Sequence, residues 1–284
     1  MEPIIAAQGA PMGRIGRSFE LVGQSYRVLM QDKELMVLPL VSGVLIIGVA
    51  VSFFFGAGLG DRIDAFDRSA PDAAFMIPMF ALYVLTYAIG IFFQAAVIAG
   101  ATERLRGGDP TVGSALAAAS RKILPILMWA VVAATVGMLL RAIQDRAGFI
   151  GKIVVGIIGA AWSLATFFVV PVIVLEESSI GESFGRSLGL FKKTWGEQFV
   201  GGASIGIAAV CAWVTLVAVV GLLAWAGIAF AAFAVGAAGA VFLAVLFPTL
   251  QGVFVASLYQ YATQGGTPRG FDAQLLSQAF VRKH

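Results

Sequence analysis

Residues 198–268 read QFVGGASIGIAAVCAWVTLVAVVGLLAWAGIAFAAFAVGAAGAVFLAVLFPTLQGVFVASLYQYATQGGTP, and none of these 71 residues carries a charged side chain. Water-soluble domains carry a charge on about a quarter of their residues, so this stretch belongs in a lipid bilayer. The whole chain agrees, because 59% of its 284 residues are hydrophobic, 12% are charged and the mean hydropathy is +0.91. The sequence therefore predicts an integral membrane protein.

Charge-free stretches predict six membrane-spanning helices. A helix rises about 1.5 Å per residue and the hydrocarbon layer is about 30 Å thick, so 198–268 must fold back at least once. We place this bend near residues 225–227. The apolar runs are continuous, which favours helices over a β-barrel with its alternating strands. The predicted fold is all-α and polytopic, with spans at about 36–58, 75–100, 123–141, 150–174, 199–224 and 231–260.

The connecting segments predict how the spans are oriented. Fourteen of the nineteen Lys and Arg residues fall in the N-terminal segment, the second and fourth loops and the C-terminal tail. Basic segments stay on the cytoplasmic side, so both termini are expected in the cytoplasm. We expect a flexible N-terminus (1–12), a single six-helix transmembrane domain (13–262) and a cytoplasmic tail (263–284).

Two or three further segments predict amphipathic helices in the membrane interface. GRSFELV at 16–22 and GRSLGLF at 185–191 align at a constant offset, and apolar side chains recur on one helix face. We expect interfacial helices at 13–31 and 179–197, with a poorer copy at 111–122. The similarity indicates either a duplicated unit of interfacial helix plus hairpin, or the stripe that any interfacial helix needs. The expected interfacial residues are Arg14, Arg17, Phe19, Tyr26, Phe184, Arg186 and Trp195.

Several short motifs resemble known membrane families. The segments that resemble a bacterial multi-pass membrane family of unknown function are RIGRSF at 14–19, DKELM at 32–36 and LPL at 38–40. The segments similar to the membrane domain attached to some glycerophosphodiester phosphodiesterases are VPVIVLEE at 170–177, GRS at 185–187 and KTW at 193–195. The resemblance implies architecture only, because the phosphodiesterase chemistry belongs to a separate soluble domain. We expect a bacterial inner-membrane protein.

Enzymatic activity, a cofactor and a metal site are not expected. The single histidine is His284, which removes histidine metal sites and Ser-His triads. The predicted spans contain no Asp or Glu, and no phosphate-binding loop is found. The aspartates of 60–72 predict a solvated turn rather than a calcium site. Nucleic-acid binding is not expected either, because the basic residues lie at membrane borders, where anionic lipid headgroups are the natural partner.

Polar residues within the spans are the first candidate site. Gln94, Thr166 and Gln251 fall in the cytoplasmic third of the second, fourth and sixth predicted spans, with Tyr87 and Thr249 nearby. An unpaired amide in hydrocarbon is unfavourable. These groups therefore either line a pathway or ligand pocket, or hydrogen-bond between helices.

Acidic residues at the cytoplasmic ends of the spans are the second candidate site. Glu103 follows the second span, and Glu176 and Glu177 follow the fourth, where Pro171 is expected to break the helix. They form either a gate or cation site at a cytoplasmic mouth, or a solvated ion-pair cluster. The candidate basic partners are Arg104, Arg121 and Arg186.

Two functional classes fit these patterns. Non-catalytic handling or transport of a lipid or another amphiphile is suggested by the possible repeat and by polar groups at matched depth. A membrane-embedded scaffold or assembly factor is suggested by the interfacial helices, by the small-residue face of Ala232, Gly236 and Ala240, and by the lack of ionisable groups in the spans. Membrane lipids are the expected partners, and a second copy or another membrane protein is the alternative.

Overall fold

The computed structural model describes residues 14–56, 73–193, 198–264 and 269–270. The expected flexible N-terminus, the acidic turn at 60–72, Trp195 and most of the expected cytoplasmic tail lie outside these residues. Within the described residues all regular structure is helical and no strand occurs. The all-α fold class is confirmed.

Among the described residues, six helical segments are long and apolar enough to cross a membrane, as the sequence predicts. They are η1 with α2, α4, α6, α7 with α8, α10 and α11. In chain order the elements are α1 (Arg14–Leu29), the 3-10 turn η1 (Lys33–Met36), α2 (Val37–Gly56), α4 (Ala73–Leu105), α5 (Val112–Arg121), α6 (Ile123–Arg146), α7 (Phe149–Ala165), α8 (Val169–Leu175), α9 (Ile180–Lys193), α10 (Gln198–Trp225) and α11 (Ala229–Gln264).

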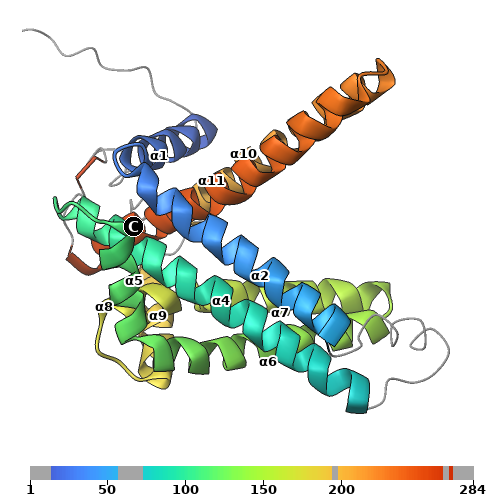
Figure 1. Cartoon of the computed structure of the whole chain (residues 1–284). Helices are drawn as coiled ribbons and strands as arrows, with labels where there is room; N and C mark the ends of the chain where they lie inside the picture. The colour runs from blue at the N-terminus through green and yellow to red at the C-terminus, as the bar shows by residue number, and fades with distance from the viewer. Residues whose placement is uncertain (1–13, 57–72, 194–197, 265–268, 271–284) are drawn as a thin grey trace, which may run out of the picture.

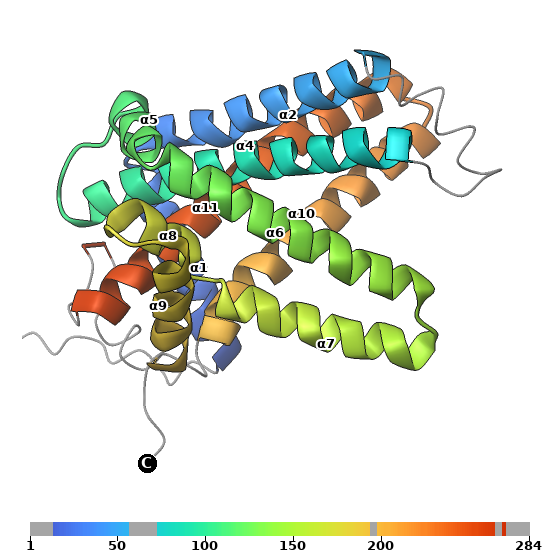
Figure 2. The same cartoon turned by 90° about the horizontal axis from the view of Figure 1, so that it is seen from below.

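The long helices of the described chain form three hairpins that share one end and fan out at the other (Figures 1 and 2). The hairpins are α2–α4, α6–α7 and α10–α11, and the short helices α1, α5, α8 and α9 gather at the shared end. One shorter helix, α1, α5 or α9, precedes each hairpin in the chain. This order fits a repeated unit, and the duplication itself stays a prediction.

Most of the buried core lies at the shared end. There α4 buries residues 95–99, α11 buries 253–256 and α8 buries 169–174. Toward the open ends, by contrast, Phe55 is 77% exposed and Val217 is 67% exposed. Apolar surface on this scale is not stable in water, so the diverging arms require acyl chains around them.

The helix α4 is central, since it packs against α2, α5, α6, α8 and α11. Its crossing with α11 is set by Gly252, because a side chain there would overlap Val97 of α4. Beyond this crossing α4 and α11 separate, as Figure 1 shows. The α10–α11 hairpin uses the same device, with Gly239 directly against Leu216 and Gly236 of the predicted small-residue face against Val220.

The fourth predicted span, 150–174, consists of two helices, and the sequence predicts a break in it at Pro171. The helix α7 ends at Ala165, residues 166–168 form a turn, and α8 begins at Val169. Pro171 is the third residue of α8, where a helix needs no backbone N–H. The break therefore lies before Pro171, further from Glu176 than the sequence predicts, because the proline ring disfavours helical backbone on its N-terminal side.

Ser187 of α9 closes this break. Its hydroxyl donates to the carbonyl oxygen of Ala165 at 2.7 Å and accepts from the N–H of Phe168 at 3.0 Å. The Ser187 side chain is fully buried. Backbone groups freed by the break are thus satisfied within the protein, as required of irregular backbone at membrane depth.

Replacing Ser187 with alanine should lower the free energy of unfolding by about 1–3 kcal/mol, because the buried N–H of Phe168 loses its partner. Denaturant unfolding of the purified protein in detergent measures this. Ser163→Ala is the matched control, since the exposed Ser163 hydroxyl donates only to the carbonyl of Gly159 in its own helix. Equal stability of the two variants would contradict the role given to Ser187.

Gly252→Ala should destabilise the protein by about 1–3 kcal/mol, because the new methyl group is forced into Val97. Gly206→Ala on α10 is the control: a Cβ there meets nothing within 4 Å, so the change should be neutral or slightly stabilising. Adding Val97→Ala to Gly252→Ala should recover part of the loss. Strictly additive losses in this double-mutant cycle would show that the two residues do not touch.

Candidate functional site

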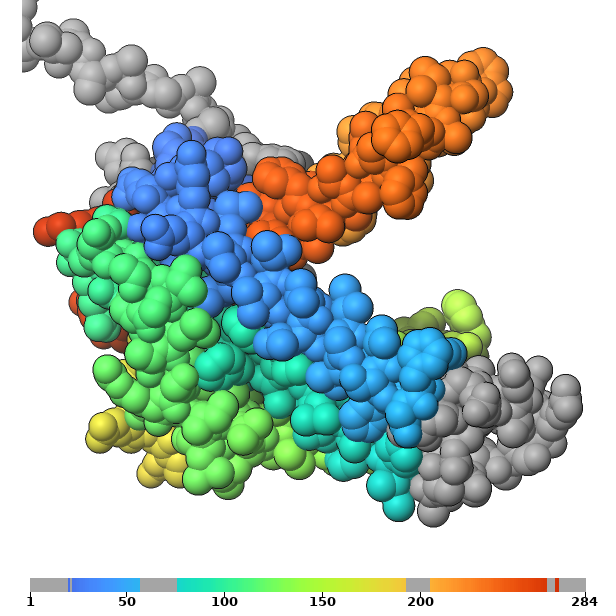
Figure 3. Space-filling view, viewed as in Figure 1, coloured from blue at the N-terminus to red at the C-terminus, as the bar shows by residue number. Residues whose placement is uncertain are grey.

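Two cavities flank the crossing of α4 and α11. The first, of about 490 Å³, lies among α4, α6, α7 and α11, and the second, of about 570 Å³, lies among α2, α4 and α11. Both volumes fall in the range of ligand pockets, about 300–1,000 Å³. The space-filling view shows the molecule notched between α2 and the α10–α11 hairpin (Figure 3). The residues that line both cavities are Tyr87, Ile91, Gln94 and Gln251.

Gln94 and Gln251 place two side-chain amides at this divide. Gln94 precedes Val97 on α4, and Gln251 directly precedes Gly252 on α11, so both lie where the helices begin to separate. Gln94 is exposed and Gln251 is half-buried. Neither amide hydrogen-bonds any residue that the structure describes. Each therefore presents unused N–H donors and a carbonyl acceptor to the cavities.

The other predicted pathway residues have separate positions. Tyr87 and Thr166 line the first cavity together with the two glutamines, and the Thr166 hydroxyl donates to the carbonyl of Trp162 at 2.8 Å. Thr249 lines neither cavity. Its side chain is fully buried and donates to the carbonyl of Val245 at 2.7 Å, which satisfies the hydroxyl within α11.

Aromatic rings that were not predicted as site residues form one wall of the first cavity. Trp129 of α6 and Trp162 of α7 stack with centroids 6.0 Å apart, and Phe184 of α9 stacks on Trp162 at 5.8 Å. Phe184, expected at the membrane interface, thus packs behind the cavity wall. Tryptophans in spans usually lie near the interfaces, so the position of Trp129 and Trp162 well inside their spans was an available signal.

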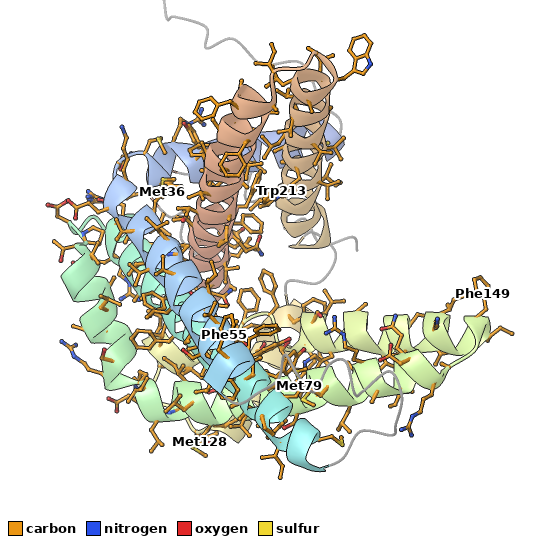
Figure 4. All side chains as sticks on the ribbon, turned by 45° about the vertical axis from the view of Figure 1, so that its right-hand side comes forward. Met36, Phe55, Met79, Met128, Phe149 and Trp213 are labelled. Carbon is orange, nitrogen blue, oxygen red and sulfur yellow. The ribbon has the colours of Figure 1, made fainter. Side chains whose placement is uncertain are left out.

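Within the described residues, no charged side chain lines either cavity. The walls consist of aliphatic and aromatic side chains, glycines and a few neutral polar groups. Figure 4 shows how the hairpins that bound this space diverge: Phe149 lies on the α6–α7 hairpin and Trp213 on the α10–α11 hairpin. The arrangement can hold an apolar molecule that carries a polar group at the glutamine pair.

At the expected cytoplasmic mouth, one group of polar contacts is centred on Glu176. The phenol of Tyr259 donates to the Glu176 carboxylate, and Arg186 Nε lies 3.5 Å from the same oxygen. Lys122 Nζ donates to the Glu176 carbonyl oxygen at 3.1 Å. The Arg186 side chain is 52% exposed, so its ion pair with Glu176 contributes little to stability and mainly links α9 to the C-terminal end of α8.

The remaining acidic residues have other surroundings. Glu103 accepts a hydrogen bond from the Ser114 hydroxyl of α5 at 3.1 Å. Glu177 is exposed and forms no ion pair with a described residue. Arg104, expected to pair with a nearby glutamate, instead pairs through two nitrogens with Asp32, which is 7% exposed. The acids therefore do not converge on one cation site within the described residues, and Asp32 joins the α1–η1 turn to the end of α4.

The three segments predicted as interfacial helices are helical, as α1, α5 and α9, and their place at the membrane interface stays a prediction. Arg14, Arg17 and Phe19 fall within α1. Tyr26 is 44% exposed, on the opposite face of α1 from the buried Val28. Ser179 directly precedes α9, and its backbone N–H and hydroxyl each donate to the Glu182 carboxylate at 2.8 Å. These two hydrogen bonds lower the pKa of Glu182.

A family of unknown function (DUF6159) matches residues 73–270, which cover α4 to α11 and the glutamine pair. The chain belongs to this family. No curated protein and no solved structure matches it. Membership of DUF6159 agrees with the expected uncharacterised family, while the likeness to the phosphodiesterase-attached membrane domain stays a prediction.

In this DUF6159 protein, replacing both Gln94 and Gln251 with leucine should leave the free energy of unfolding unchanged or raise it. Neither amide bonds a described residue, so no interhelical contact is lost. Thermal and denaturant unfolding in detergent measure the change. A loss larger than about 1 kcal/mol, the size of an interhelical hydrogen bond, would show instead that the glutamines tie α4 to its neighbours.

Proposed function

We propose that this protein holds or moves a lipid or another amphiphile between its helices, without catalysis, in a bacterial inner membrane. One observation carries the proposal: the amides of Gln94 and Gln251 have no partner among the described residues and face two cavities whose described lining carries no charge. An amphiphile suits this arrangement because its polar group can meet the amides while its chains contact the cavity walls.

Two unpaired amides at membrane depth are unfavourable unless a ligand supplies their hydrogen-bond partners. Moving an amide from water into a medium without hydrogen-bonding partners costs about 4–8 kcal/mol. A chain that needed only helix packing at positions 94 and 251 would gain from leucine at both. Two free amides at the divergence of α4 and α11 are therefore best explained by a polar group that is supplied from outside the chain.

The orientation of the site follows from charge. Most Lys and Arg residues belong to the segments at the shared end, including Arg104, Lys122 and Arg186, which supports a cytoplasmic shared end and cytoplasmic termini. The cavities then lie below that surface, within the cytoplasmic half of the bilayer. Three successive units of a short helix and a hairpin also suit a transporter or carrier, since such folds often arise by duplication.

The neutral lining favours passive handling. Coupled transporters usually keep ionisable groups at membrane depth to relay protons or ions. No such group lines either cavity in the part of the chain that the structure describes. Binding, presentation or passive movement of an amphiphile is therefore better supported than a proton-driven pump.

Mass spectrometry of molecules retained after gentle detergent extraction tests this function. The wild type should retain a specific amphiphile, and Gln94→Leu with Gln251→Leu should lose most of it. Gln144→Leu is the matched control, because Gln144 is exposed near the end of α6 and lines neither cavity. Recovery of partner proteins alone, with no retained amphiphile, would contradict the proposal and favour the scaffold function.

A further inference from the structure

We infer that the amphiphile has two hydrocarbon chains and a small uncharged head, as in the diacylglycerols. This inference rests on the proposed function and adds the chemical class of the ligand. The structure joins three features at the glutamine pair: a described lining without charge, a close helix crossing directly beside it, and a cavity on either side.

The lining excludes a charged head. A phosphate held against neutral amides at this depth would have no counter-charge and would lose its hydration. Three basic groups at the shared end are engaged within the protein: Arg104 with Asp32, Arg186 with the Glu176 carboxylate and Lys122 with the Glu176 carbonyl. An amide both donates and accepts, so it complements a hydroxyl or an ester.

The helix crossing limits the size of the head. Directly beyond the amides toward the shared end, residues 95–99 of α4 and 252–256 of α11 are buried, and Gly252 lies against Val97. The two cavities run along either side of this packing, where Val97 lines the second and Val255 the first. Gln94 also stands 11 residues before the end of α4, or about 16 Å at 1.5 Å per residue. A head at the amides therefore lies among acyl chains, well below the phospholipid headgroups.

The two cavities account for two chains. The first is walled by Trp129, Trp162 and Leu140, and the second by Pro39, Ile46 and Phe93. Both reach the glutamine pair, which belongs to the lining of each. A head placed at the amides thus has a separate compartment, without a charged side chain in its described lining, for each chain.

Tryptophan fluorescence gives a direct readout of chain entry. Trp129 and Trp162 line the first cavity, whereas Trp213 and Trp225 are 39% and 86% exposed and would contact any lipid. Replacing Trp195, Trp213 and Trp225 with phenylalanine leaves the two cavity tryptophans as the only ones. In nanodiscs of unlabelled phospholipid, brominated chains quench these tryptophans when they enter the cavity.

The test compares brominated diacylglycerol with brominated phosphatidylethanolamine and phosphatidylglycerol at equal mole fractions. Diacylglycerol should quench at the lowest mole fraction. Gln94→Leu with Gln251→Leu should raise the diacylglycerol needed for half-quenching about tenfold, since two hydrogen bonds are lost. Gln144→Leu should not. Equal quenching by the three lipids would overturn the ligand class but leave the lipid cavity standing, and no quenching by any of them would overturn the proposed function as well.

Discussion

The contact of Gly252 with Val97 is the constraint on which the rest of the structure depends. Because a glycine lets α11 approach α4 closely at this level, the two helices cross there and can only separate beyond it. Toward the shared end the crossing is continued by buried alanines and valines, which form the core with α8. Toward the open end it leaves a widening gap, and Gln94 and Gln251 stand where that gap begins.

Polar groups at membrane depth need hydrogen-bond partners. The described residues supply them at the α7 break but not at the glutamine pair. Where α7 breaks, Ser187 reaches across from α9 and satisfies the exposed backbone, so the break is closed inside the protein. At the glutamine pair no described side chain takes that part. This contrast is why the glutamine pair matters. The same fold satisfies the backbone N–H at the α7 break, yet leaves two side-chain amides facing cavities without charged lining among the described residues.

The helical class and the six spans could be predicted from the sequence because apolar runs are a local property of the chain. Depth along the spans also follows from local counting, which is why Gln94, Thr166 and Gln251 could be expected at one level. Long-range contacts could not be predicted this way. The partner of Arg104 is Asp32, 72 residues away, and the break before Pro171 is completed by Ser187 on another helix. Thr249 is buried and Gln251 is only half-buried because of the helices that pack on each face of α11, and sequence periodicity does not identify those neighbours.

The hairpins diverge in the bilayer, so the tips of α7 and α10 should be far apart, and this distance can be measured. The single cysteine, Cys211, can be replaced by serine, and spin labels can then be attached at Phe149→Cys and Trp225→Cys near the tips of α7 and α10. In nanodiscs, double electron–electron resonance should give a separation well beyond the roughly 8–10 Å between the axes of packed helices. A short, narrow distance placing the two tips in contact would contradict the account, because the gap at Gln94 and Gln251 would then be closed by protein.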